Sequence, residues 1–215
     1  SREVIKPRDV LYTIEGVTAI SPRGKCTVTM TVRGKLYLDQ KGRQFSIDAQ
    51  NVNRVLCLPH VNNREDSLGL VLDDPIQVGK QQTTIVLLKF PRKKTPTVTW
   101  KADSWNAFES AGKGRELLTE FRKQGAAAPP AEVLAASWAD VAVERPTPEM
   151  FQTSDAKLAL ACNVKANGGF LYPLKGGLFF VGKPLMFLDR DGIEEIKAAR
   201  GGSAVGFYFD LHVEH

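Results

Sequence analysis

Alternation of apolar and polar residues with a period of two dominates both ends of this 215-residue chain and limits what it can fold into. The first half holds seven such stretches, rich in β-branched residues and about ten residues apart. They are Val10–Ile14, Cys26–Val32, Leu36–Leu38, Gln44–Ile47, Arg54–Leu58, Leu68–Leu72 and Thr84–Phe90. Turn signals separate them at Ser21–Gly24, Gln40–Gly42 and Asp73–Pro75. Seven short strands at this spacing predict a barrel or a sandwich.

The period changes to that of a helix between residues 103 and 124, a stretch without proline. Asp103 or Ser104 would cap its start, although two glycines in the middle favour a true beginning near Lys113. Gly125 stands where a cap glycine ends many helices. A barrel of seven strands closed by one helix is the pleckstrin-homology architecture, so we predict a first barrel of this type over residues 1–125.

The alanine and proline run at Ala126–Pro130 is the expected boundary, because two successive prolines cannot continue a helix. We therefore predict a linker over residues 126–148, with a short helix at Ala131–Ala139. Period-two stretches then resume at Lys157–Val164, Gly169–Leu174, Leu178–Val181, Leu185–Leu188, Ile193–Ala198 and Val205–Val213. The predicted fold class is mainly β with a few helices, as two pleckstrin-homology-like β-barrels in tandem, the second over residues 149–215 and incomplete at its C-terminal end.

The last predicted strand would leave an edge of the second barrel uncovered. Its inward set would be Val205, Phe207, Phe209 and Leu211, and no closing helix follows it. A bare edge beside apolar side chains promotes aggregation, so we expect the chain to continue past His215, the helix at Ala131–Ala139 to cover the edge, or a neighbouring molecule to pair with it. We also expect Trp100, Trp105 and Trp138 to supply buried area between the two barrels.

Motifs for chemistry are weak in this sequence. Gly177–Lys183 has the spacing of a phosphate-binding loop, but Pro184 replaces the magnesium-binding hydroxyl and no helix pattern follows, so a hairpin turn is the better interpretation. Asp189–Glu195 lacks the full ligand set of a calcium loop and is predicted to be a tight turn. The three histidines have no metal-ligand neighbour at useful spacing, and no nucleophile has a partner that sequence reveals. We expect neither an enzyme nor a cofactor.

Cysteine usage and hydropathy bear on the compartment. Cys26, Cys57 and Cys162 are widely spaced in apolar stretches, which predicts buried free thiols and fits the cytosol or the nucleus. No apolar run approaches the ~20 residues of a membrane-spanning helix.

The net charge of +5 is unevenly distributed. The first 147 residues carry 22 lysines and arginines against 16 acidic residues, and the rest carry seven against eight. In the first half, basic residues gather in predicted loops at Arg23 and Lys25, at Lys41 and Arg43, and at Arg92–Lys94. Such loops are either ordinary exposed surface or, where loops converge at one end of a barrel, one binding patch for a polyanion or an acidic protein face.

Several motifs resemble one family, the histone chaperones with a double pleckstrin-homology module. In the first half they are Ser21–Lys25, Val55–His60 and Leu72–Ile76; in the second half they are Gly168–Leu174, Phe179–Pro184 and Phe207–Leu211. The sequence is similar to two branches of it: the middle domain of the small, HMG-box-bearing subunit of the FACT complex, and the fungal Rtt-type chaperone. The similarity covers most of residues 9–90 and 144–214.

The resemblance implies a nuclear protein that binds the core histones, specifically the histone three–four pair, for nucleosome assembly, without a cofactor and without catalysis. It assigns binding to Ser21, Arg23 and Lys25 in the first inter-strand turn. It further assigns a loop that reads the histone to Lys165, Ala166, Asn167 and Gly168, where the loop is shorter than in the Rtt-type branch. The basic loops suit DNA phosphates as a further partner, because histones are themselves basic. Acidic positions such as Asp73–Asp74 suit histones better.

Two other functions remain open from the residues alone. Pleckstrin-homology domains often hold a phosphoinositide headgroup with basic residues of the first hairpin loop, where Arg23 and Lys25 lie. A plain scaffold or adaptor is also compatible, since a fold does not fix a function.

Overall fold

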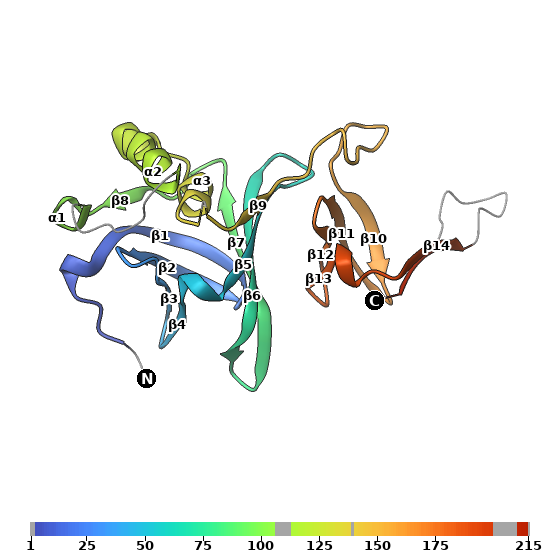
Figure 1. The fold of residues 1–215 in the computed structure, drawn as a ribbon, viewed down its shortest axis with the longest axis horizontal. Coiled ribbons are helices and arrows are strands. Elements are labelled where there is room, and N and C mark those ends of the chain that lie inside the picture. Colours follow the sequence, from blue (N-terminus) through green and yellow to red (C-terminus); the bar gives the residue numbers. More distant parts are fainter. Residues whose placement is uncertain (1–2, 106–112, 139, 200–209, 215) are drawn as a thin grey trace. The chain divides into compact units, whose positions relative to one another are not determined.

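The computed structural model describes residues 3–105, 113–138, 140–199 and 210–214 (Figure 1). The chain divides into two compact units, Ser1–Arg145 and Pro146–His215. In the described part of the chain, no helix is both long and apolar enough to cross a membrane.

The first unit is built on one nine-stranded sheet (Figure 1). Its strands are β1 (Val10–Ser21), β2 (Gly24–Thr31), β3 (Leu36–Gln40), β4 (Arg43–Ile47), β5 (Val52–Pro59), β6 (Glu65–Val78), β7 (Gln81–Pro91), β8 (Val98–Trp100) and β9 (Ala142–Glu144). The order along the sheet is β4-β3-β2-β1-β7-β6-β5-β9, and β8 pairs with β1. All neighbours run antiparallel except β5 and β9, which run parallel.

Strand β1 curls the sheet because it belongs to both of its halves. Its early residues pair with β2 and β8, and its last residues pair with β2 and β7. A bulge at Glu15–Gly16, where Gly16 has φ +73°, shifts the register between Ile14 and Val17. The extra residue keeps both Ile14 and Val17 on the buried face while the strand bends. The predicted strand at Val10–Ile14 is therefore only the first half of β1.

The helical elements of the first unit follow β8, except for two short 3-10 turns. These elements are η1 (Pro7–Asp9), η2 (Ala49–Asn51), α1 (Ala102–Trp105), α2 (Lys113–Gln124), η3 (Gly125–Ala127) and α3 (Pro130–Ala136). Helix α2 is described from Lys113 to Gln124 and is followed by Gly125 at φ +59°. Residues 106–112 lie outside the described part of the chain, so the predicted start near Lys113 stays a prediction. Asp103 and Ser104 lie inside α1, so neither caps α2. Strands, a curled sheet and a closing helix give the first unit the predicted pleckstrin-homology architecture.

The segment predicted as a linker over residues 126–148 lies mostly in the core of the first unit. Helix α3 packs against β5 and β6, and its Val133 and Leu134 are fully buried. The hydroxyls of Tyr12 and Ser137 are 2.6 Å apart across 125 residues of sequence. Pro130 stands in the first turn of α3, where a missing N–H costs nothing, so the proline pair starts a helix here. The expectation that this helix covers an edge of the second unit stays a prediction.

The three tryptophans also belong to the first unit. Trp138 is buried in the core cluster, and Trp100 and Trp105 pack against that cluster. The Trp100 ring stands edge-on to Tyr12 at 5.2 Å between centroids and to Trp105 at 5.9 Å. These aromatic contacts stabilise the first unit, and a role for the tryptophans between the two units stays a prediction.

Strand β6 differs from the prediction at its middle. It continues through Asp73–Pro75, which the sequence marked as a turn, by a register irregularity between Val71 and Ile76. The side chain of Asn51 holds the bulge by bonding the backbone N–H and carbonyl of Asp74, at 2.7 and 3.0 Å. The chain reverses instead at residues 79–80, where Gly79 has φ +63°. The short strands β8 and β9 were not predicted.

The described part of the second unit forms two small sheets (Figure 1). Strands β10 (Leu160–Val164), β11 (Asn167–Leu174), β12 (Gly177–Val181) and β13 (Met186–Asp189) are neighbours in that order, and β14 (Glu195–Ala199) pairs with β15 (Asp210–Glu214) after a 3-10 turn, η4 (Arg190–Gly192). All six predicted strands are therefore represented, and the chain is mainly β.

The face predicted for the last strand is only partly testable. Val205, Phe207 and Phe209 lie outside the described residues. Leu211, predicted to face a core, is 40% exposed, so its predicted burial is wrong. The buried side chains of this unit come mainly from β11 and β12, where Tyr172, Phe179 and Phe180 are each at most 3% exposed.

Candidate functional site

The turn between β1 and β2 carries the first set of residues proposed from the sequence. Ser21 ends β1, and its hydroxyl donates to the Ile85 carbonyl of β7 at 2.8 Å. Pro22 and Arg23 form the turn, and the side chains of Arg23 and Lys25 are exposed. The serine therefore fastens the turn to the sheet, and the two cations are left to solvent.

Gln40, at the end of β3, joins this turn to the next hairpin. Its side chain is 8% exposed, and its amide N–H donates to the Pro22 carbonyl at 2.8 Å. The amide oxygen accepts from the Arg43 guanidinium at 3.2 Å. Gly24 passes so close that an added Cβ would lie 3.1 Å from the Gln40 side chain. The β1–β2 and β3–β4 turns are thus locked to each other through one buried amide.

Four cations consequently share one end of the barrel. Lys41 lies in the β3–β4 turn, and Arg43 follows it with its guanidinium carbon 5.8 Å from the centre of the Phe45 ring. With Arg23 and Lys25 they form what we call the basic hairpin surface; all four side chains are exposed. The sequence showed these residues as two separate pairs, and the structure unites them.

The thiol beneath this surface is neutral. Cys26 follows Lys25 in β2. Its side chain is buried, and it lies opposite Gln40 in the register of β2 and β3. Burial, reinforced by the negative charge of Asp39, raises the pKa of Cys26 to about 11. The thiol therefore stays protonated at neutral pH and adds no negative charge to the surface.

The third basic cluster, Arg92–Lys94, lies at the other end of β7. Strand β1 runs antiparallel to β7, with Thr18 opposite Lys89 and Ser21 opposite Leu87, so the β1–β2 turn points toward the start of β7. Arg92 follows the far end of β7. The backbone N–H of Arg92 donates to the Arg64 carbonyl at 2.9 Å. The predicted convergence therefore holds for two of the three clusters.

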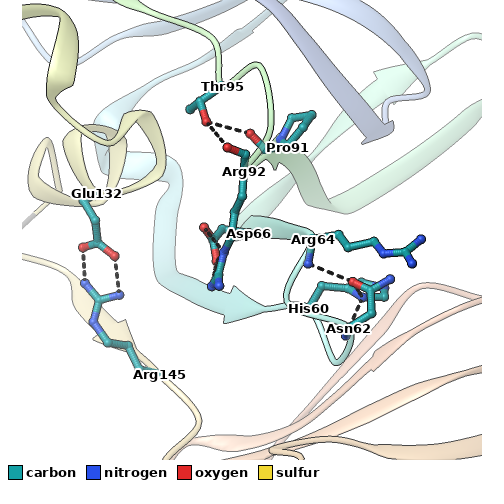
Figure 2. Close-up of polar contacts among 9 residues, drawn as sticks. All are labelled: His60, Asn62, Arg64, Asp66, Pro91, Arg92, Thr95, Glu132 and Arg145. Carbon is teal, nitrogen blue, oxygen red and sulfur yellow. Dashed lines mark hydrogen bonds and ion pairs between the residues drawn. The ribbon is translucent and has the colours of Figure 1, made fainter.

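Arg92 is also the one member of its cluster that an acidic group neutralises (Figure 2). Its guanidinium donates to both oxygens of Asp66, at distances from 2.7 to 3.3 Å. This charged contact raises the pKa of Arg92 further, so its guanidinium stays charged at neutral pH. Lys93 and Lys94 beside it are exposed.

The second set of residues proposed from the sequence forms a different hairpin. Lys165 and Ala166 make the two-residue turn between β10 and β11, and Lys165 has φ +55°. Asn167 and Gly168 open β11 opposite Val164 and Asn163. All four residues are exposed. They lie together on the second unit, whereas Ser21, Arg23 and Lys25 lie together on the first.

The acidic doublet of β6 is held rigidly at the surface. Asp73 accepts from the Asn53 amide at 2.9 Å, and the Asp74 backbone is held by Asn51. Both aspartates are exposed. The sequence pattern predicted a turn at Asp73–Pro75, but the doublet lies within strand β6.

Two ion pairs fix the end of the first unit. Arg54 of β5 bonds Glu144 of β9, and both side chains are largely buried. The Arg145 guanidinium donates to both carboxylate oxygens of Glu132 in α3, at 2.7 and 3.2 Å (Figure 2). Burial raises the pKa of the neighbouring Cys57 to about 11, partly offset by the positive charge of Arg145.

The weak motifs have structural roles. Residues 177–181 form strand β12, and the chain turns into β13 without a helix, so the hairpin interpretation is confirmed. Asp189 caps the η4 turn by accepting from the Asp191 backbone at 3.0 Å, as a tight turn requires. Across the described residues, no group of three or more metal-ligating side chains gathers.

Comparison with protein families gives two matches. The model of the SSRP1 PH domain family matches residues 9–118. The model of the histone chaperone Rttp106-like middle domain matches residues 158–215.

Individual relatives point in the same direction. The FACT complex subunit SSRP1-A of Oryza sativa subsp. japonica is 27% identical over 216 residues, covering 99% of this chain and 33% of that protein. The FACT complex subunit POB3 of Mycosarcoma maydis is 26% identical over 214 residues, covering 95% and 36%. The chain thus spans about a third of the length of these relatives. A solved structure of the Spt16D Pob3N heterodimer aligns over 87% of this chain and 77% of that one, with 8% identity and a TM-score of 0.34, too low to support an argument.

Proposed function

The chain belongs to the SSRP1-like PH domain family, and from that membership we propose that it is a histone-binding module of a nuclear chromatin chaperone. The observation that carries this proposal is the order of two family matches on one chain, a PH domain at residues 9–118 followed by a histone chaperone middle domain at residues 158–215. They confirm the resemblance to tandem pleckstrin-homology histone chaperones. The relatives are FACT complex subunits.

We propose the histone three–four pair as the partner and nucleosome assembly as the process. Binding needs neither a cofactor nor a catalytic group, because the module acts by covering histone surface. The hairpin of Lys165, Ala166, Asn167 and Gly168 is the proposed contact on the second unit.

Acidic surface supplies the electrostatic part of this proposal. Histones are strongly basic, and a binding partner with opposite charge steers their association and fixes its register. Asp73 suits this role because the Asn53 amide holds its carboxylate, so little side-chain entropy is lost on binding. Asn51 fixes the backbone of Asp74, which keeps the second carboxylate beside the first. Glu194 and Glu195, where β14 begins, are further exposed acidic positions.

Retention of purified histone pairs tests the proposal. We expect the immobilised chain to retain the histone three–four pair in preference to the other core pair, with binding that weakens as salt rises. Asp73→Asn/Asp74→Asn should release the histones at lower salt. Glu116→Gln/Glu120→Gln, which removes two exposed charges from α2, is the matched control and should behave like the parent. Failure of the parent chain to retain either pair would contradict the proposal.

A phosphoinositide-binding protein is the second candidate, favoured by Arg23 and Lys25 in the first hairpin. Flotation with vesicles that contain a phosphorylated phosphoinositide separates the two functions, because a chaperone module should stay in the soluble fraction.

A further inference from the structure

Three hydroxyl residues of this chain stand directly before a proline, namely Ser21, Thr95 and Thr147. Proline-directed protein kinases act on such pairs, in which the proline has no N–H and favours an extended residue before it. We propose that Thr95 is a phosphorylation site for a kinase of this class, and that its phosphate then binds the cations that precede it in the chain. This inference goes beyond the proposed function and does not rest on it.

Access to the hydroxyl sets Ser21 apart from the two threonines. Ser21 is half-buried in β1, and its hydroxyl bond to the Ile85 carbonyl of β7 joins two strands of the nine-stranded sheet. A kinase binds its substrate as an extended segment, so it would have to detach the end of β1 from β7 to reach this oxygen. The fold therefore protects Ser21 from modification.

Thr95 is exposed in the loop of residues 92–97, which joins β7 to β8 and lies outside any strand. Its hydroxyl oxygen is 2.8 Å from the Pro91 carbonyl oxygen and 3.1 Å from that of Arg92, so its bonds stay within its own turn (Figure 2). Presenting this hydroxyl to an enzyme breaks these local bonds and leaves the pairing of the strands intact.

Thr147 is exposed as well, but its neighbours would repel a phosphate. The carboxylate of Glu149 accepts from its own backbone N–H and from the Thr147 hydroxyl, and these bonds lower the pKa of Glu149. The hydroxyl therefore stands beside a negative charge at neutral pH. The nearest cation along the chain, Arg145, already donates to both carboxylate oxygens of Glu132.

Three cations directly precede Thr95. Arg92 shares its charge with Asp66, at 2.7 Å, whereas in the described part of the chain no hydrogen bond or ion pair engages the side chains of Lys93 and Lys94. A phosphothreonine carries a charge of about −1.5 to −2 and three strong acceptor oxygens at neutral pH. It would bind the two ammonium groups and compete with Asp66 for the guanidinium. Thr95 alone among the three hydroxyl residues thus combines exposure with available cations.

The modification also changes the turn itself. The transfer forms a bond between the Thr95 oxygen and the γ-phosphorus of ATP, breaks the bond from that phosphorus to ADP and releases the hydroxyl proton. The donor that bonded the Pro91 and Arg92 carbonyls is then gone, and the phosphate oxygens repel those carbonyl oxygens. The side chain turns toward the cations, so the cluster Arg92–Lys94 beside Asp66 changes from a positive to a nearly neutral surface.

The first test treats the whole chain with ATP and a purified mitogen-activated protein kinase, and locates the phosphate by peptide mass spectrometry. We expect phosphate at Thr95 and none at Ser21. Thr95→Val keeps the size of the side chain and should lose this phosphate, whereas Thr95→Ser keeps the hydroxyl and should retain it. A Thr95 that stays unmodified after prolonged treatment overturns the inference, as does phosphate on Ser21 in its place.

The second test titrates the phosphate by phosphorus NMR, in a Thr147→Val background that leaves one phosphate signal. Cations favour the dianion, so the pKa of the phosphate should be lower in the folded chain than in concentrated urea by about 0.5 unit or more.

Variants identify the groups that cause this difference. Lys93→Gln/Lys94→Gln should remove most of it, and Asp66→Asn, which deletes the competing carboxylate, should enlarge it. Lys41→Gln/Arg43→Gln removes two exposed cations at the other end of the barrel and is the matched control, which should leave it unchanged. Equal pKa values of the phosphate in the folded and the unfolded chain overturn the proposed binding, as do equal losses in the control and the Lys93→Gln/Lys94→Gln variant.

Discussion

The two units use similar strands to build very different interiors. In the first, the core draws on β1 to β8 and on α2 and α3, and many of its side chains are fully buried. In the described part of the second, five apolar residues are buried, and every residue of β13 is only half-buried. Alternation alone does not make a core. A second layer must cover the apolar face, and in the first unit the curled sheet and α3 provide it.

This contrast predicts where the free energy of unfolding resides. A curled sheet covered by helices removes more apolar area from water than a four-stranded sheet and a two-stranded ribbon do. We therefore expect the first unit to be the more stable part of the chain.

The largest expected effect tests whether α3 belongs to the core of the first unit. Leu134→Ala deletes a fully buried side chain and should lower the free energy of unfolding by about 2–5 kcal/mol. Leu117→Ala, at a 39% exposed position in α2 of the same unit, is the control and should change it by less than about 1 kcal/mol. Urea denaturation followed by tryptophan fluorescence measures both, because all three tryptophans lie in the first unit. If both variants lower the free energy of unfolding by equally small amounts, residues 126–148 act as a linker and not as part of the core.

Thiol reactivity sharpens the comparison without a mutation. Burial raises the pKa of both Cys26 and Cys57 from 9.0 to about 11, so at pH 8 each has roughly 100-fold less thiolate than an unperturbed thiol. Cys162 in the second unit is only half-buried. Alkylation of the native chain with iodoacetamide, read by peptide mass spectrometry, should therefore label Cys162 first. Labelling of Cys57 at a comparable rate would show that the first unit opens readily.

Gly169 provides a perturbation confined to the second unit. A Cβ there would lie 2.5 Å from the Val181 carbonyl and 2.6 Å from the Phe180 ring, so β11 and β12 must separate. Gly169→Ala should cost the second unit about 1–3 kcal/mol. Amide hydrogen exchange should show faster exchange over β10 to β13, whereas the tryptophan-detected urea midpoint stays unchanged. A shifted midpoint would mean that the two units unfold together.

The smallest expected effect concerns the turns that carry the proposed contacts. The side chains of Arg23 and Lys25 are exposed, and among the described residues none holds them by a hydrogen bond or ion pair, so Arg23→Glu/Lys25→Glu should change stability by less than about 0.5 kcal/mol. Differential scanning calorimetry should give a melting temperature close to that of the parent. Lys165→Glu on the second unit should be similarly silent. A large fall in the melting temperature of either variant would show that the fold depends on its turn.

Much of the fold was predictable because its signals are local. The alternation of the longer strands, the turn at Ser21–Gly24 and the helical period up to Gln124 depend on neighbours in sequence, and the structure has each of them. The family resemblance, carried by short motifs, was likewise available before any coordinates. Strands β8 and β9 were missed because three residues are too few to show a period.

The basic hairpin surface shows the limit of such local signals for the candidate site. Its four cations were visible in the sequence as two pairs, together with a third basic cluster that lies elsewhere. Nothing local marks Gln40 as the residue that joins the two turns, because its partners are 18 residues upstream and three downstream. Its only signal was its place in the predicted turn at Gln40–Gly42.

The sequence by itself determined which of the longer segments are strands and which loops carry charge. Tertiary structure decided which segments share a core. Side-chain alternation is a property of one strand, whereas the contact between Tyr12 and Ser137 joins residues 125 positions apart. The alanine and proline run after α2 has the composition of a linker, and it became core because the first unit's curled sheet left an apolar face that α3 could fill.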